Sequence, residues 1–148
     1  MESNQNNRCG CSRGESDHGP WPYTADIMRA ARQNRNFRTA FWTGCRLQMT
    51  LMSIPPCGEI GVEMHSDTDQ FIRVEEGNAV VRMGDCKDGL NSRCSLGTGE
   101  AVFVPRGTWH NVINNGNCPL KLSSVYAPPQ HPRGTVQRTG EDASAEAY

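Results

Sequence analysis

The segment Gly99–Asn114 constrains the fold of this chain more than any other part of the sequence. It follows the spaced pattern Gly-x5-Pro-x-Gly-x2-His-x3-Asn, in which Pro105, Gly107 and His110 are fixed positions. Proline presets the φ angle of a turn and glycine accepts positive φ, so the Pro-x-Gly unit predicts a tight reversal between two short strands. His110 opens the second strand, where its side chain can point into a cavity.

A second spaced motif lies upstream, at Gly58–Gly77. Within it, Glu63 and His65 are two residues apart and share one face of a predicted strand, roughly 6.5 Å apart at about 3.3 Å rise per residue. The opposite register would turn Val62 and Met64 inward instead. That register would also point His65 outward, and the residues alone leave both registers open.

The two motifs together resemble the two signatures of the cupin superfamily, over about residues 37–127. Every defining position of the second signature is present at Gly99–Asn114. The first signature is roughly Gly-x5-His-x-His-x3,4-Glu-x6-Gly, and here Glu63 replaces its first histidine while Gln70 replaces its glutamate. Gly58 also lies one residue closer than the signature asks. The chain most resembles the small stand-alone cupins described as mannose-6-phosphate-isomerase-like.

This resemblance implies one divalent metal ion held inside the barrel by Glu63, His65, Gln70 and His110. Two imidazoles and a carboxylate suit zinc, manganese, iron(II), nickel or cobalt, and the sequence does not choose among these five. Gln70 is the weakest of the four ligands, and a hydrogen bond to metal-bound water or to the core is an equal alternative. Glu63 is the candidate catalytic residue, as a proton carrier when the metal does not fully engage it.

Other residues are candidates for substrate contact. Arg38, Gln48 and Tyr126 are placed to hold an anionic or hydroxylated substrate, although each is as readily structural. His131 lies in a proline-rich segment that would cover the barrel. It is either an acid or base on a lid or, more simply, an exposed loop histidine.

The remaining pattern predicts an all-β fold, a cupin double-stranded β-helix (jelly-roll barrel) with a short N-terminal helix. The helix is expected over residues 24–33, with Thr24 as its N-cap. Short segments rich in β-branched and aromatic residues alternate with Gly, Pro, Asn and Asp clusters, which is typical of antiparallel barrels. The predicted strands cover residues 37–43, 46–54, 61–65, 70–75, 79–83, 93–96, 101–104, 110–114 and 120–126.

A chain of 148 residues is expected to form one domain. The composition divides it into a disordered leader at 1–20, a cupin domain at 21–135 and a C-terminal tail at 136–148. The seven cysteines are expected to be free thiols in or near the core. Cys9 and Cys11 with His18 form a weak candidate for a second zinc site, and a disordered tail is the simpler interpretation.

Net charge of −1 and a pI near 6.4 predict neither nucleic-acid nor membrane binding. No apolar run approaches the roughly 18 residues of a bilayer span. The N-terminus has no apolar segment typical of a secretory signal, so a cytoplasmic location is expected.

Three functions follow from the resemblance. The first is a metal-dependent isomerase or lyase acting on a small polar substrate, sugar-like or a hydroxy-carbonyl compound. The second is an Fe(II)-dependent dioxygenase, and the third is a non-catalytic module that binds a metal or a small ligand. Similar proteins are commonly homodimers, so a homodimer is expected as well.

Overall fold

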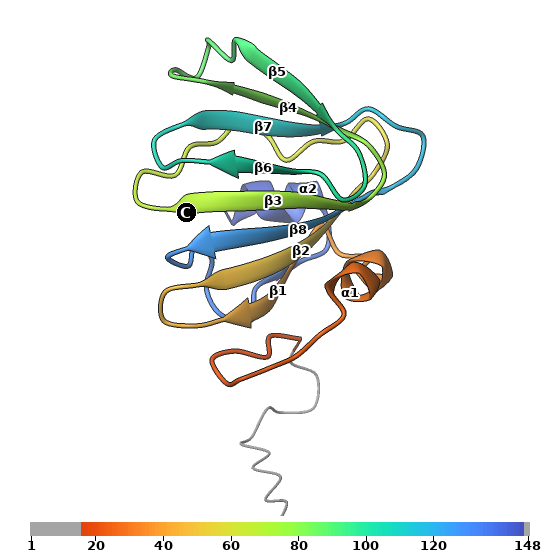
Figure 1. Cartoon of the computed structure of the whole chain (residues 1–148), viewed down its shortest axis with the longest axis vertical. Coiled ribbons are helices and arrows are strands. Elements are labelled where there is room, and N and C mark those ends of the chain that lie inside the picture. Colours follow the sequence, from red (N-terminus) through yellow and green to blue (C-terminus); the bar gives the residue numbers. More distant parts are fainter. Residues whose placement is uncertain (1–15, 147–148) are drawn as a thin grey trace, which may run out of the picture.

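Two antiparallel sheets face each other and enclose the core in the computed structural model, which describes residues 16–146 (Figure 1). One sheet has six strands in the order β6-β3-β8-β2-β1-β9, and the other has three in the order β5-β4-β7. The strands are β1 (Arg38–Thr43), β2 (Gln48–Ile54), β3 (Asp69–Glu76), β4 (Ala79–Gly84), β5 (Ser92–Leu96), β6 (Ala101–Val104), β7 (Trp109–Asn114), β8 (Leu120–Ala127) and β9 (Val136–Gln137). The all-β cupin jelly roll expected from the sequence is confirmed.

The core fills the space between the two sheets. Inward positions alternate along the strands, as in β3, where Ile72 and Val74 are fully buried while Phe71 and Arg73 face outward. The core cluster comprises Phe37, Met52, Ile54, Ile72, Val74, Ala79, Val81, Val102, Val104, Val112, Leu120 and Leu122. Near one end of the barrel, polar residues replace apolar ones at inward positions, among them Gln70 of β3 and His110 of β7.

The prediction of a strand at 61–65 is wrong, because this segment does not form a regular strand. The segment between β2 and β3 runs beside β7 and pairs with it only through isolated bridges, Glu59 with Ile113 and Glu63 with His110. Gly61 separates the two bridges and has a φ of 102°, a conformation that extended strands do not contain. Pairing is therefore interrupted just before the residues that build the site.

The N-terminal helix α1 (Ile27–Gln33) begins later than predicted. Asp26, not Thr24, is its N-cap, because the Asp26 carboxylate accepts a hydrogen bond from the backbone N–H of Arg29 at 3.1 Å. The helix packs over the outer face of β2, β3 and β8 (Figure 1). Neither helix of the described chain has the length and apolarity needed to span a bilayer.

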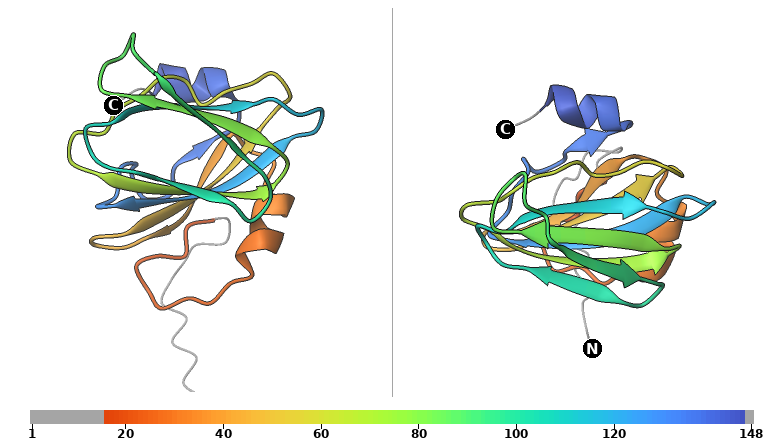
Figure 2. Two further views of the ribbon diagram at one scale, coloured as in Figure 1. Left: turned by 45° about the horizontal axis from the view of Figure 1, so that its top comes forward. Right: turned by 90° about the horizontal axis from the view of Figure 1, so that it is seen from above.

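The C-terminal segment carries structure that the composition did not predict. β9 pairs with β1, and helix α2 (Gly140–Ala145) then lies beside the barrel, apart from both sheets (Figure 2). A capping box starts α2: Thr139 Oγ1 accepts from the Asp142 N–H, and the Asp142 carboxylate accepts from the Thr139 N–H. The residues expected to be a tail thus add a strand and a helix to the barrel.

The N-terminal residues that the structure describes also contact the barrel. Asp17 is fully buried, and its carboxylate accepts hydrogen bonds from Thr43 of β1 and from the N–H groups of Gly19 and Gly134. Ordered structure therefore reaches upstream of residue 20, the predicted end of the leader. Cys9 and Cys11 lie outside the described residues. The five described cysteines are free and exposed, so their predicted place in or near the core is wrong.

A row of apolar side chains crosses the outer face of the six-stranded sheet. Phe103 of β6 lies opposite Phe71 of β3, which lies opposite Val125 of β8. Val125 in turn faces Met49 of β2, and Met49 faces Trp42 of β1. Phe103, on the edge strand, is 73% exposed. We call these five residues the outer apolar row.

Gln48 of β2 holds the proline-rich segment against the barrel. Its Nε2 donates to Thr43 Oγ1 at 3.0 Å and to the His131 carbonyl at 2.8 Å. Its Oε1 accepts from the backbone N–H groups of Gln130 and His131. Both ends of this fully buried amide are thus occupied by protein groups.

We expect Gln48→Ala to lower the free energy of unfolding by roughly 1–3 kcal/mol, because buried donors and acceptors would lose their partners. Chemical denaturation measures this change. The matched control is Gln33→Ala, at an exposed position of α1, with an expected change within about 0.5 kcal/mol. Equal stability of the two variants would contradict the role given to Gln48.

Candidate metal centre

Three potential metal ligands converge inside the barrel: Glu63, His65 and His110. Their ligand atoms all lie within 4.8 Å of one another. The Oε1 atom of Glu63 is 3.5 Å from the Nε2 atom of each histidine. The three residues come from both sequence motifs, and the structure brings these motifs together at one site.

Backbone hydrogen bonds fix this convergence. Glu63 and His110 exchange two N–H to carbonyl bonds of 2.9 Å across their isolated bridge. The N–H of Gly107 donates to the His65 carbonyl at 2.7 Å, so the Pro-x-Gly turn of one motif docks on the histidine of the other. Gly107 has a φ of 81°, and no atom lies within 4 Å of where its Cβ would be. Backbone conformation, not space, therefore requires glycine here.

The protonation of His110 leaves one nitrogen available as a ligand. Its Nδ1 lies 2.9 Å from the Thr108 carbonyl oxygen. A carbonyl can only accept, so Nδ1 carries the proton and Nε2 of the neutral ring has a free lone pair. A backbone carbonyl on the far nitrogen is the usual support of a metal-binding histidine.

The ligand atoms fit a cation for a further reason. Glu63 Oε1, His65 Nε2 and His110 Nε2 are buried and have no hydrogen-bond partner within the described chain. Buried polar atoms are normally satisfied, and each one left alone costs free energy. A divalent ion bound to all three would satisfy them together. The donor set of two imidazoles and a carboxylate suits such an ion.

Glu63 is ionised at neutral pH. Burial alone would raise the pKa of its carboxyl group, but the polar contacts with His110 and His65 lower that pKa by more, to well below the ordinary value. The site therefore presents a negative charge between two imidazoles. A cation is the natural complement of that arrangement.

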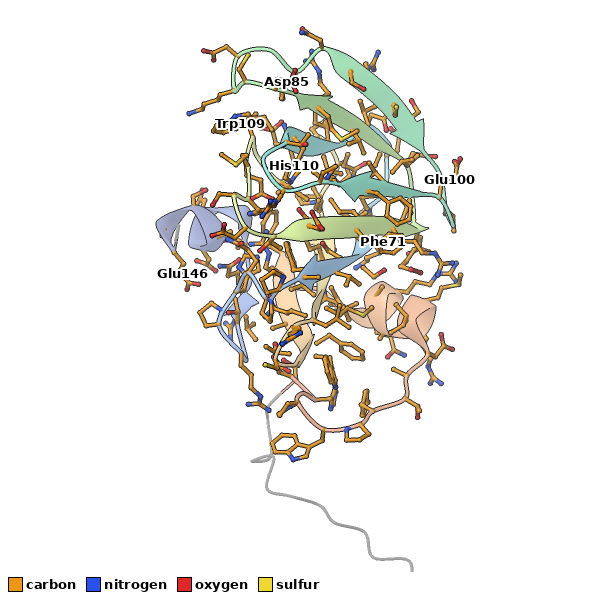
Figure 3. All side chains as sticks on the ribbon, turned by 60° about the vertical axis from the view of Figure 1, so that its left-hand side comes forward. Phe71, Asp85, Glu100, Trp109, His110 and Glu146 are labelled. Carbon is orange, nitrogen blue, oxygen red and sulfur yellow. The ribbon has the colours of Figure 1, made fainter. Side chains whose placement is uncertain are left out.

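A cavity of about 310 Å³ adjoins Glu63 and His65. Arg38, His131 and Gln137 line it from the barrel, and α2 with the residue that follows it supplies the remaining wall through Ala143, Ser144 and Glu146. Figure 3 shows His110 within the barrel and Glu146 beside α2, on the side of the molecule away from Phe71. A small molecule in this cavity would contact Glu63 and His65, two of the three ligand side chains.

The other predicted site residues lie near this centre in different settings. Gln70 is buried; its Nε2 donates to Ser124 Oγ at 2.8 Å, and its Oε1 has no partner in the described part of the chain. Its role as a ligand stays a prediction. Tyr126 is buried edge-on to the His65 ring, with centroids 5.8 Å apart, and burial raises the pKa of its hydroxyl.

Of the predicted substrate residues, Arg38 lines the cavity, whereas Gln48 and Tyr126 are not among its lining residues. Their contact with a ligand stays a prediction. His131 is half-buried in the cavity wall, not exposed on a loop. Burial, with the nearby charge of Arg38, lowers its pKa to about 3, so its ring is neutral at pH 7.

The cavity residues of the C-terminal segment are not apparent from the sequence. Gln137, Ser144 and Glu146 lie in a stretch expected to be a tail because it is short, polar and acidic. A signal is present: Thr139 followed three residues later by Asp142 fits a capping box and marks a helix start. Nothing in the sequence indicates that this helix borders the cavity.

The fold and the three converging ligands are those of a small cupin with a candidate metal site. Residues 50–126, more than half of the chain, match the family described as Cupin domain, and the chain belongs to this family.

The chain is also similar to proteins from several organisms. YrkC of Bacillus subtilis (strain 168) is 54% identical over 129 residues, which cover 87% of this chain and 69% of YrkC. L612 of Acanthamoeba polyphaga mimivirus is 36% identical over 77% of this chain and 70% of its own length. Among solved structures, BH2720 from Bacillus halodurans is 52% identical with a TM-score of 0.87, covering 88% of this chain and 98% of BH2720. These similarities support the fold but do not identify a reaction.

We expect the purified protein to bind Co²⁺ or Zn²⁺ and to be stabilised by it. A metal at about 100 times its dissociation constant adds roughly 2.7 kcal/mol to the free energy of unfolding. The double variant His65→Ala/His110→Ala should lose both the binding and the stabilisation, because a single carboxylate remains. Elemental analysis and thermal melting with and without chelator measure these effects.

The control for this experiment is Gln33→Ala, at an exposed position of α1 outside the Glu63, His65 and His110 cluster. Metal content and the metal-dependent shift in melting should match the wild type. Undiminished metal binding by the double variant would show that the centre lies elsewhere.

Proposed function

We propose that this cupin is a metal-dependent enzyme of the isomerase or lyase type, acting on a small sugar-like or hydroxy-carbonyl substrate. The observation that carries this proposal is the cluster of Glu63, His65 and His110, whose ligand atoms have no hydrogen-bond partner in the described chain. Glu63 and His65 also line a cavity together with Arg38 and His131. When bound, a divalent metal supplies a Lewis acid that polarises a substrate carbonyl.

The side chains of this chain have separate tasks in that reaction. The imidazoles of His65 and His110 are directed toward the site and would hold the ion. Glu63 is ionised, so its carboxylate can take a proton from carbon beside a carbonyl when the ion does not engage both oxygens. The neutral ring of His131 and the guanidinium of Arg38 face the same cavity and can orient a polar substrate.

Proton exchange in small hydroxy-carbonyl compounds tests this function. Zn²⁺-loaded protein is incubated with dihydroxyacetone or glyceraldehyde in D₂O, and proton NMR follows loss of the signal beside the carbonyl. We expect exchange at least tenfold faster with the loaded protein than with the His65→Ala/His110→Ala variant. Exchange no faster than in buffer, for both compounds and with Mn²⁺ and Co²⁺ as well, would contradict the proposal.

One feature favours the second candidate, an Fe(II)-dependent dioxygenase. Two histidines and one carboxylate with open positions are the ligand set of many non-haem iron oxygenases. Protein loaded with Fe(II) under anaerobic conditions would then consume oxygen in a substrate-dependent manner. Metal binding without either reaction would favour the third candidate, a non-catalytic binding module.

We further propose that the protein acts as a homodimer, with the outer apolar row as the contact face. A flat apolar row can pack on its own copy through a twofold axis, which is the commonest symmetry of oligomers. Phe103, the most exposed member, would then be covered.

The variant Phe103→Glu tests the dimer, because it places two like charges across the twofold contact. We expect a shift from dimer to monomer in sedimentation velocity, with Val136→Glu, at an exposed apolar position outside the row, as the control. A wild-type monomer at micromolar concentration would contradict the proposal.

A further inference from the structure

Arg38 is a buried cation with no ion-pair partner among residues 16–146. Its side chain lines the cavity although the residue is only 4% exposed. Its Nη1 donates to Gln137 Oε1, while its Nε is buried and has no hydrogen-bond partner in the described chain. Burying an unpaired guanidinium is costly, so an anionic partner is expected at this position.

The surroundings of Arg38 define which nitrogen of the guanidinium is available. Nη1 donates to Gln137 and Nε is shielded by the protein, so Nη2 is the nitrogen that remains for a ligand. Its two N–H groups can donate to a carboxylate oxygen. The local charge agrees, since one guanidinium and one divalent ion would outweigh the two negative charges of Glu63 and Glu146 on the cavity wall.

The chain itself places a carboxylate on the same network. Gln137 accepts from Arg38 through Oε1 and donates through Nε2 to Glu146 Oε2 at 3.1 Å. Glu146 also lines the cavity. Gln137 thus links Arg38 to the Glu146 carboxylate through a neutral amide, without an ion pair between the two charged groups.

We infer that Arg38 binds the carboxylate of a small hydroxy or oxo acid, whose hydroxyl or carbonyl end lies toward Glu63, His65 and His110. This inference rests on the proposed function and narrows its substrate class from polar compounds in general to acids. The cavity of about 310 Å³ has room for a small acid of this kind. Arg38 would contact the substrate directly and leave the metal ligands unchanged.

Calorimetric titration with glycolate and glycolamide tests the inference, because the two probes share a hydroxyl and differ in charge. We expect Co²⁺-loaded protein to bind glycolate at least tenfold more tightly than glycolamide. Arg38→Gln should weaken glycolate binding at least tenfold and leave Co²⁺ affinity and glycolamide binding unchanged. The matched control is Arg138→Gln, which removes the same charge from an exposed position next to Gln137 and should behave as the wild type.

A second variant guards against misfolding of Arg38→Gln, which circular dichroism would detect. Arg38→Lys keeps the charge but not the guanidinium, so it should bind glycolate with intermediate affinity. Equal binding of glycolate by the wild type and a folded Arg38 variant would overturn the inference, as would equal binding of glycolate and glycolamide.

Metal-free protein, titrated in parallel, separates this inference from the proposed function. Glycolate binding that depends on Arg38 in a protein unable to take up Co²⁺ would refute the metal centre and support the anion site. Co²⁺ uptake that depends on His65 and His110, with glycolate binding indifferent to Arg38, would do the reverse.

Discussion

The backbone pairing between Glu63 and His110 is the interaction that builds the site. It joins the segment between β2 and β3 to the start of β7, and it places the side chains of Glu63 and His110 next to each other. The bond from Gly107 to the His65 carbonyl adds the third. Because backbone groups fix all three positions, the ligand atoms are held close together before any ion binds, at the cost of leaving them unsatisfied.

The charges inside the barrel follow from these ligand atoms, which lack hydrogen-bond partners in the described chain. The core supplies an apolar surrounding in which an isolated carboxylate would become protonated, yet Glu63 keeps its charge because two imidazoles face it. Arg38, which lines the same cavity, adds a cation with no ion-pair partner among the described residues. The site therefore suits charged ligands: a metal ion bound by Glu63, His65 and His110 and, as we infer, an acid bound by Arg38.

The C-terminal segment turns this barrel into a bounded cavity. β9 extends the larger sheet beyond β1 and brings Gln137 opposite Arg38, and α2 then adds Ser144 and Glu146 to the wall. The contact is light, since no residue of α2 is fully buried and the helix has only six residues. Residues whose composition predicted only a tail thus form part of the cavity wall next to the candidate metal centre.

The amino-acid sequence alone specifies the fold and most of the centre. Alternating strands and turn residues carry the information for the fold locally. Glu63, His65 and His110 are predicted through the resemblance of the two spaced motifs to the cupin signatures. The ends of helices and strands are predicted less accurately. Helix α1 is capped by Asp26, and the strand predicted at 61–65 is interrupted at Gly61, because capping hydrogen bonds and positive φ angles outweigh average residue propensities. The sequence leaves open whether Gln70 is a metal ligand, because an amide side chain can either bind a metal ion or form hydrogen bonds within the core.

How the cavity is closed, and which polar groups remain without partners, is settled by the folded chain. The hydrogen bonds of Gln48 to the proline-rich segment, of Arg38 to Gln137, and of Gln137 to Glu146 join residues up to 99 positions apart. A sequence pattern records what each residue is able to donate or accept. Which partner it finds, and which atom it leaves free, depends on distances that exist only after the chain has folded.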